Sequence, residues 1–93
     1  MDSKFENVTM DSDTRLLSQE TLKTGEWDAL FQACKWDGIY GESLIYVLSE
    51  VEHMGDEELK KLALESGRVK KVSEFTIGRN DETGYVFINF NFS

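Results

Sequence analysis

The spacing of apolar residues changes near Gly67, and this change constrains the fold of the chain more than any other feature. Before Gly67, apolar residues recur at intervals of three and four, which is typical of one buried helical face. Near the C-terminus the interval falls to two, the side-chain period of a half-buried strand. The alternating residues are Val86, Ile88, Phe90 and Phe92. The sequence therefore predicts helices first and strands afterwards.

A β-hairpin is the expected structure of the C-terminal third. The alternating strand is preceded by a second candidate strand over Val69 to Ile77. Residues 78–84 join the two and are rich in Gly, Asn and Asp, the residues that favour tight turns. We expect the two strands to pair in an antiparallel manner.

Four helical segments are predicted in the first two thirds, at Leu16 to Leu22, Glu26 to Trp36, Glu42 to Met54, and Glu57 to Ser66. The second places its apolar residues on one helical face and ends at the pair Asp37-Gly38. Gly55 is a natural end for the third helix, and Asp56 a cap for the fourth. Residues 1–12 show no clear period.

These elements together predict one domain spanning residues 1–93, because no Pro-rich, Ser-rich or low-complexity stretch divides the chain. The expected fold class is α+β. Three to four short helices would pack on a small antiparallel sheet that includes the C-terminal β-hairpin.

The residues needed for catalysis or metal binding are scarce. The chain has one histidine and one cysteine, so a nucleophile with a neighbouring base is not expected, and Cys34 fits a buried packing role. His53 lies near Glu52 and Asp56, but Gly55 interrupts the helical spacing that a metal site would need. We predict no enzymatic activity, no catalytic residue, no metal and no cofactor.

The composition of the sequence also indicates a cellular compartment. Cys34 cannot form an internal disulfide, and the first residues lack the apolar run of a secretory signal. No apolar stretch approaches the length needed to span a bilayer, and a net charge of −8 is repelled by anionic lipid. We expect a cytoplasmic protein without membrane function.

Acidic residues are concentrated in the first part of the chain. Residues 1–58 hold fourteen acids and four bases, a net charge of −10, whereas residues 59–93 hold four acids and six bases, a net charge of +2. Such asymmetry favours a directed interaction surface. The predicted surface consists of Glu20, Glu26, Asp28, Asp37, Glu42, Glu50, Glu52, Asp56, Glu57 and Glu58.

This surface is expected to face another protein rather than a nucleic acid. Glu42 and Glu50 lie eight residues apart and would share one helical face, which residues 56–58 continue past the corner. An array of carboxylates can take the place of DNA phosphates, because much of the affinity for nucleic acids is electrostatic and independent of sequence. The expected partner is a DNA-binding protein, and direct binding of nucleic acid is disfavoured.

In length, acidity and expected α+β character, the chain resembles the small DNA-mimic anti-restriction proteins of bacteriophages, most closely the anti-restriction nuclease (Arn) proteins of T-even phages. The resemblance rests on acids such as Glu42, Glu50 and residues 56–58. It implies an inhibitor that occupies the DNA-binding site of a host restriction endonuclease of the McrBC type, in the host cytoplasm. The chain departs from the most acidic mimics in its ten bases and near-neutral hairpin.

Two other functions remain open. The chain could be an inhibitor or immunity-type protein that binds a basic partner through a specific interface, with the acids serving to steer the encounter. It could also be a structural or regulatory subunit that uses Tyr85, Phe87 and the hairpin as its contact. A continuous acidic ridge favours mimicry, whereas an apolar patch rimmed by acid favours the specific inhibitor.

A homodimer is expected from the length of the chain. A globule of this size is about 30 Å across and matches only about nine base pairs, whereas two subunits would present about 60 Å. Two-fold pairing is the commonest oligomeric arrangement. The predicted seam is the less acidic hairpin, with Phe87, Phe90 and Phe92 near an exposed sheet edge.

Overall fold

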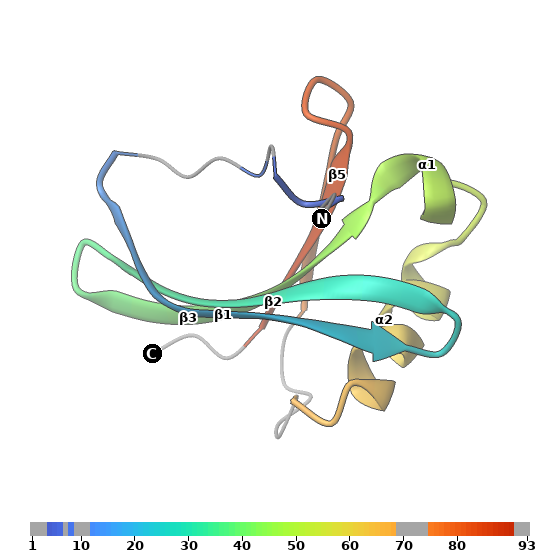
Figure 1. Cartoon of the computed structure of the whole chain (residues 1–93), viewed down its shortest axis with the longest axis horizontal. Coiled ribbons are helices and arrows are strands. Elements are labelled where there is room, and N and C mark those ends of the chain that lie inside the picture. Colours follow the sequence, from blue (N-terminus) through green and yellow to red (C-terminus); the bar gives the residue numbers. More distant parts are fainter. Residues whose placement is uncertain (1–3, 7, 9–11, 69–74, 91–93) are drawn as a thin grey trace.

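The computed structural model describes residues 4–6, 8, 12–68 and 75–90. It contains a five-stranded antiparallel sheet and two short helices (Figure 1). The elements in chain order are β1 (Thr14–Thr24), β2 (Trp27–Trp36), β3 (Ile39–Val47), α1 (Leu48–Val51), α2 (Asp56–Glu65), β4 (Thr76–Asn80) and β5 (Tyr85–Phe90). The radius of gyration is 12.5 Å, which agrees with the size expected for this length.

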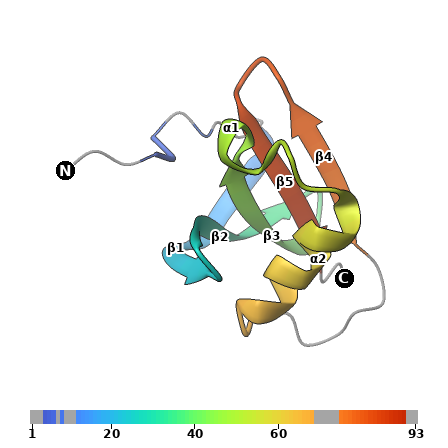
Figure 2. The ribbon, with the colours of Figure 1, turned by 90° about the vertical axis from the view of Figure 1, so that its right-hand side faces the viewer.

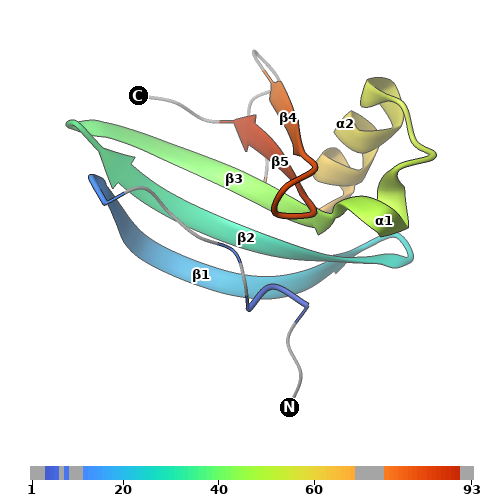
Figure 3. The same cartoon turned by 90° about the horizontal axis from the view of Figure 1, so that it is seen from above.

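The strand order across the sheet is β1-β2-β3-β5-β4, so β1 and β4 form the two edges. The strands β1, β2 and β3 follow one another through tight turns, and β5 pairs with β3 before β4 pairs with β5. The sheet is strongly twisted, since β5 runs steeply across the direction of β1 to β3 (Figures 1 and 3). Helix α2 lies on one face of this sheet.

The predicted helices at residues 16–22 and 26–36 are wrong, because both segments are strands. In β2, the side chains of Ala29, Phe31 and Ala33 face α2, while those of Leu30 and Cys34 face the other side. A strand buried on both faces reads as a continuous apolar run, which helical spacing also fits. The expected α+β fold with three to four helices is therefore corrected to a sheet-dominated fold with two short helices.

The turn between β2 and β3 explains the same error. Asp37 and Gly38 both have positive φ angles, +47° and +79°, and Trp36 pairs directly with Ile39. A two-residue loop with two positive φ angles is the type I′ turn of a β-hairpin, for which Asp-Gly is a preferred pair. The pair therefore reverses a strand instead of ending a helix.

The segment predicted as a helix at residues 42–54 divides into two elements. Its first part belongs to β3, and only four residues from Leu48 form α1. The other expectations hold better: the helix predicted at 57–66 is present as α2, and the C-terminal hairpin is present as β4 and β5. Residues 78–80, predicted as part of its turn, belong to β4. Residues 69–74 of the first predicted hairpin strand lie outside the described residues.

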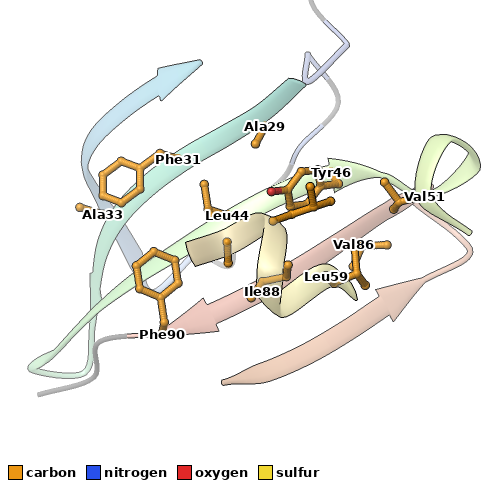
Figure 4. Packing of buried hydrophobic residues seen from close by; sticks show 12 residues of the cluster. Ala29, Phe31, Ala33, Leu44, Tyr46, Val51, Leu59, Val86, Ile88 and Phe90 are labelled. Atoms are coloured by element: carbon orange, nitrogen blue, oxygen red, sulfur yellow. The ribbon is translucent and has the colours of Figure 1, made fainter. Parts of the chain in front are cut away.

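The main core lies between α2 and the sheet face that it covers. Leu59, Leu62 and Ala63 of the helix pack against strand residues that share this face (Figure 4). The largest fully buried side chains there include those of Tyr46 and Phe90. The hydroxyl groups of Tyr46 and Thr24 form a buried hydrogen bond of 2.6 Å. This polar pair links the end of β1 to β3 inside the core.

A smaller apolar cluster covers part of the opposite sheet face. Phe5 is 6% exposed and packs with Leu30, Ile45 and Tyr85. Its ring stacks on that of Tyr85 with the centroids 6.2 Å apart, and the Tyr85 hydroxyl donates to the carbonyl oxygen of Lys4 at 2.7 Å. Residues 4–6 are thus held on the face away from α2 (Figure 3).

Candidate acidic binding surface

Seven of the ten predicted acids belong to elements on one side of the molecule. This side carries the turn between β1 and β2, the start of β2, both helices and the linker between them (Figure 2). We name the set the acidic end: Glu26, Asp28, Glu50, Glu52, Asp56, Glu57 and Glu58. The fold brings these residues together although more than thirty positions separate the first from the last.

A ring contact ties two segments of the acidic end together. Trp27 begins β2, and its side chain lies against that of His53 with the ring centroids 5.9 Å apart. Glu26 precedes this tryptophan and Glu52 precedes the histidine. Both carboxylates are exposed, and the contact places their segments side by side.

Lys4 neutralises part of this surface. Its Nζ lies 2.8 Å from Oε2 of Glu50 and 2.9 Å from Oδ2 of Asp28. Hydrogen bonds to Glu50 and then to Asp28 raise the pKa of the Lys4 ammonium group. One cation therefore bridges α1 and β2, and each of these two carboxylates has a partner within the chain.

A second ion pair occupies Asp56 at the start of α2. Nη2 of Arg79, on β4, lies 2.7 Å from Oδ1 of Asp56. The remaining members of the acidic end are Glu26, Glu52, Glu57 and Glu58, which are all exposed and have no ion-pair partner within the described part of the chain. These four carboxylates carry most of the unneutralised charge of the surface, because Lys4 offsets only one of the two charges of Asp28 and Glu50.

Glu65 belongs beside this surface, although sequence reasoning did not include it. A Cβ atom placed on Gly25 would lie 3.2 Å from Oε2 of Glu65, so the last residue of α2 reaches the turn between β1 and β2. Its position 39 residues after Glu26 gave no local signal. Only the antiparallel turn at Gly25, where φ is +64°, brings the two residues close.

The other three predicted acids lie elsewhere. Glu20 is in β1 and pairs with Arg68, whose guanidinium group also lies 5.2 Å from the centre of the Phe31 ring. Asp37 is in the turn between β2 and β3, at the far end of the sheet from the helices (Figure 1). Glu42 is in β3 and raises the pKa of the Tyr40 hydroxyl, although burial contributes more to that shift.

The shared helical face predicted for Glu42 and Glu50 does not exist. Glu42 lies within a strand and Glu50 within α1, so the eight-residue interval does not correspond to two helical turns. The predicted continuation at residues 56–58 is present as the first turn of α2. The acidic surface is therefore assembled by strand pairing and not by one long helix.

The two described residues of the predicted dimer seam lie in different environments. Phe90 has no exposed area and packs between Phe31 and Phe75, so it is part of the core and not of a surface. Phe87 is half-buried beside the smaller apolar cluster. Phe92 lies outside the described residues.

The described residues hold no cluster of three or more His, Cys, Asp or Glu side chains arranged for a metal ion. Cys34 is buried, and this burial raises the pKa of its thiol, which disfavours the reactive thiolate. Trp27 and Trp36 lie at opposite ends of β2 and on opposite faces, so they do not form one stacking platform. None of the described helices has the length and apolar character required to cross a bilayer.

Comparison of the chain with protein-family models, with curated proteins and with solved structures found no match.

Proposed function

We propose that this chain is a DNA-mimic inhibitor: its acidic end occupies the basic, nucleic-acid-binding surface of another protein. The observation that supports the proposal is the gathering of Glu26, Glu52, Glu57 and Glu58 on one side, exposed and without ion pairs in the described residues. The resemblance in length and acidity to phage anti-restriction proteins makes a host restriction endonuclease of the McrBC type the target class, within the host cytoplasm.

The physical argument is one of charge replacement. A protein that binds DNA presents Lys and Arg side chains to phosphates, and carboxylates on a folded surface can contact the same cations. The turn between β1 and β2, the C-terminal end of α1 and the first turn of α2 hold the four carboxylates on a pre-formed scaffold. Little conformational freedom is then lost on binding, which leaves more of the electrostatic attraction as affinity.

A second candidate function is an inhibitor or immunity-type protein that recognises a basic partner through a specific interface. Two observations favour it. The Trp27 and His53 rings lie among the acids, and Lys60 and Lys61 follow the acidic first turn of α2. A surface with aromatic rings and both signs of charge can discriminate between partners as well as attract them.

The proposal is tested by removing the four exposed charges together. Glu26, Glu52, Glu57 and Glu58 are replaced by Gln, and inhibition of DNA cleavage by a modification-dependent endonuclease of the McrBC type is measured. Exposed ion pairs contribute about 0.2 to 1 kcal/mol each, so we expect the inhibitory affinity to fall about tenfold or more.

A matched control removes four exposed acids away from the acidic end. Asp13, Asp37 and Asp81 are replaced by Asn and Glu82 by Gln, and all four positions are exposed. We expect this variant to inhibit like the native chain. Equal loss in both variants would assign the effect to net charge alone, and no inhibition by the native chain would contradict the target class.

A further inference from the structure

The outer edge of β1 is the longest strand edge of the sheet, and no other described strand pairs with it. Its eleven residues contain no proline, and most of their side chains are exposed. Leu16 and Leu17 are 42% and 45% exposed, and they are two of the four exposed large hydrophobic residues in the described chain. A long edge with free backbone donors and acceptors is a template for another strand.

The charge along β1 differs from that of the rest of the first 58 residues. It holds Arg15, Glu20 and Lys23, a net charge of +1 within a chain of net charge −8. The opposite edge is less suitable for a second copy. Strand β4 has five residues and leads into a turn that contains Asp81 and Glu82. Strand β4 itself also carries a net charge of +1, from Arg79, so it is the greater length of β1 that distinguishes the two edges.

Arg15 and Glu20 can each form an additional ion pair with a charged partner. Arg15 lies directly opposite Lys35 on β2, a like-charge pair, and it has no ion-pair partner within the described residues. The contact from Arg68 to Glu20 uses Oε2 of the carboxylate, and within the described residues no second donor occupies Oε1. An arginine opposite a glutamate across two strands is a stabilising pair, whereas two basic residues are not.

One antiparallel register satisfies both side chains. We propose that two copies of this chain pair along β1 about a two-fold axis between Leu17 and Ser18, with Arg15 of each copy opposite Glu20 of the other. The inference is independent of the proposed inhibitor function. It also moves the dimer seam away from the C-terminal hairpin, where Phe90 is buried in the core.

The same register determines which residues of the two β1 strands lie opposite each other. Leu16 then lies opposite Gln19 of the second copy, and Thr14 lies opposite Thr21. The pairing of β1 with β2 has an irregularity between Leu16 and Ser18, and this position falls at the two-fold axis. The regular segments on either side of it, 14–16 and 19–21, pair with each other, and Leu17 lies opposite Ser18. Two five-stranded sheets become one ten-stranded sheet.

The test uses two charge-reversal variants. Each variant alone is expected to weaken the dimer, and a mixture of the two is expected to restore it. Sedimentation equilibrium of the native chain, between about 10 and about 200 µM, is expected to show a mass approaching twice 10.7 kDa. Arg15→Glu places glutamate against glutamate, and Glu20→Arg places arginine against arginine. Each variant alone is expected to raise the dimer Kd about tenfold or more. An equimolar mixture restores both opposite-charge pairs and is expected to recover the dimer.

Lys61→Glu, an exposed change of the same size and sign as Arg15→Glu but on α2, serves as the control and is expected to dimerise like the native chain. Circular dichroism of each variant checks that it is folded. A native chain that stays monomeric over this range overturns the proposal. Dimers that survive both reversals overturn it as well, and so does a mixture of monomeric variants that does not recover. Loss of the dimer in Lys61→Glu would mean that net charge alone weakens dimerisation, and this result would also overturn the proposal.

Discussion

Replacement of Tyr46 by Phe tests the buried polar pair that links β1 to β3. Tyr46 has no exposed area, Thr24 is 1% exposed, and their hydroxyl oxygens are 2.6 Å apart. Phenylalanine fills nearly the same space but leaves the Thr24 hydroxyl buried without this partner. We expect a loss of about 1 to 2 kcal/mol in the free energy of unfolding at pH 7.

The same substitution has a defined dependence on pH. Burial, aided by the charge of Glu65, raises the pKa of Tyr46 from 10.0 to about 12, while the hydrogen bond to Thr24 acts in the opposite direction. The unfolded chain therefore loses this proton first. Between about pH 10 and about pH 12 the folded state binds more protons, so the stability contributed by Tyr46 falls as pH rises through this window. At pH 11 the fall amounts to about 1.4 kcal/mol.

Urea unfolding followed by tryptophan fluorescence measures both effects. The native chain is compared with Tyr46→Phe at pH 7, 9 and 11, and the difference between them isolates Tyr46 from other groups that titrate. We expect the native chain to be more stable at pH 7, and most of this advantage to disappear by pH 11. An advantage that is constant with pH would refute the assignment of Tyr46 to a buried, protonated state.

Two further predictions concern residues 4–6. Phe5→Ala removes a ring that is 6% exposed in the smaller apolar cluster, and thermal unfolding is expected to show a loss of about 2 to 4 kcal/mol; a change below about 0.5 kcal/mol would show that the segment contributes no packing energy. Lys4→Gln removes the cation between Asp28 and Glu50. Titration of the proposed target, an endonuclease of the McrBC type, is expected to show tighter binding at low salt, because two more carboxylates become available, and weaker binding would contradict the charge-replacement argument.

The parts of the fold that the sequence predicted have strong local signals. Helix α2 has an acidic first turn and apolar residues on one face, and it lies at a sheet surface where only that face is buried. Apolar and less apolar residues alternate along strand β5, because neighbouring elements bury one face of the strand more than the other. Each pattern corresponds to one structure, so the prediction succeeded for both elements.

The three strands β1 to β3 could not be read in the same way. Strand β2 is buried on both faces, which removes the alternation that identifies a strand, and the edge strand β1 is mostly exposed and rich in residues that also favour helices. The informative signal was Asp37-Gly38, whose flanking residues Trp36 and Ile39 pair across a type I′ turn. Reading this pair as a hairpin turn would have corrected both β2 and β3.

The candidate surface was predictable in composition but not in arrangement. The excess of acid before residue 59 indicated the region, yet pairing of the strands decided which carboxylates meet. Long-range ion pairs with Lys4 and Arg79 then offset part of the charge of several of these carboxylates. Such contacts join residues more than twenty positions apart, and no periodicity in the sequence indicates them.

The most direct test of the proposed function is competition between this chain and duplex DNA for one site on the target. Binding of the native chain to a restriction endonuclease of the McrBC type is measured by fluorescence anisotropy at increasing salt and with increasing unlabelled duplex DNA. DNA mimicry predicts that affinity falls steeply with salt and that the DNA displaces the chain completely. Binding that is indifferent to both would contradict the claim that the acidic end replaces DNA phosphates.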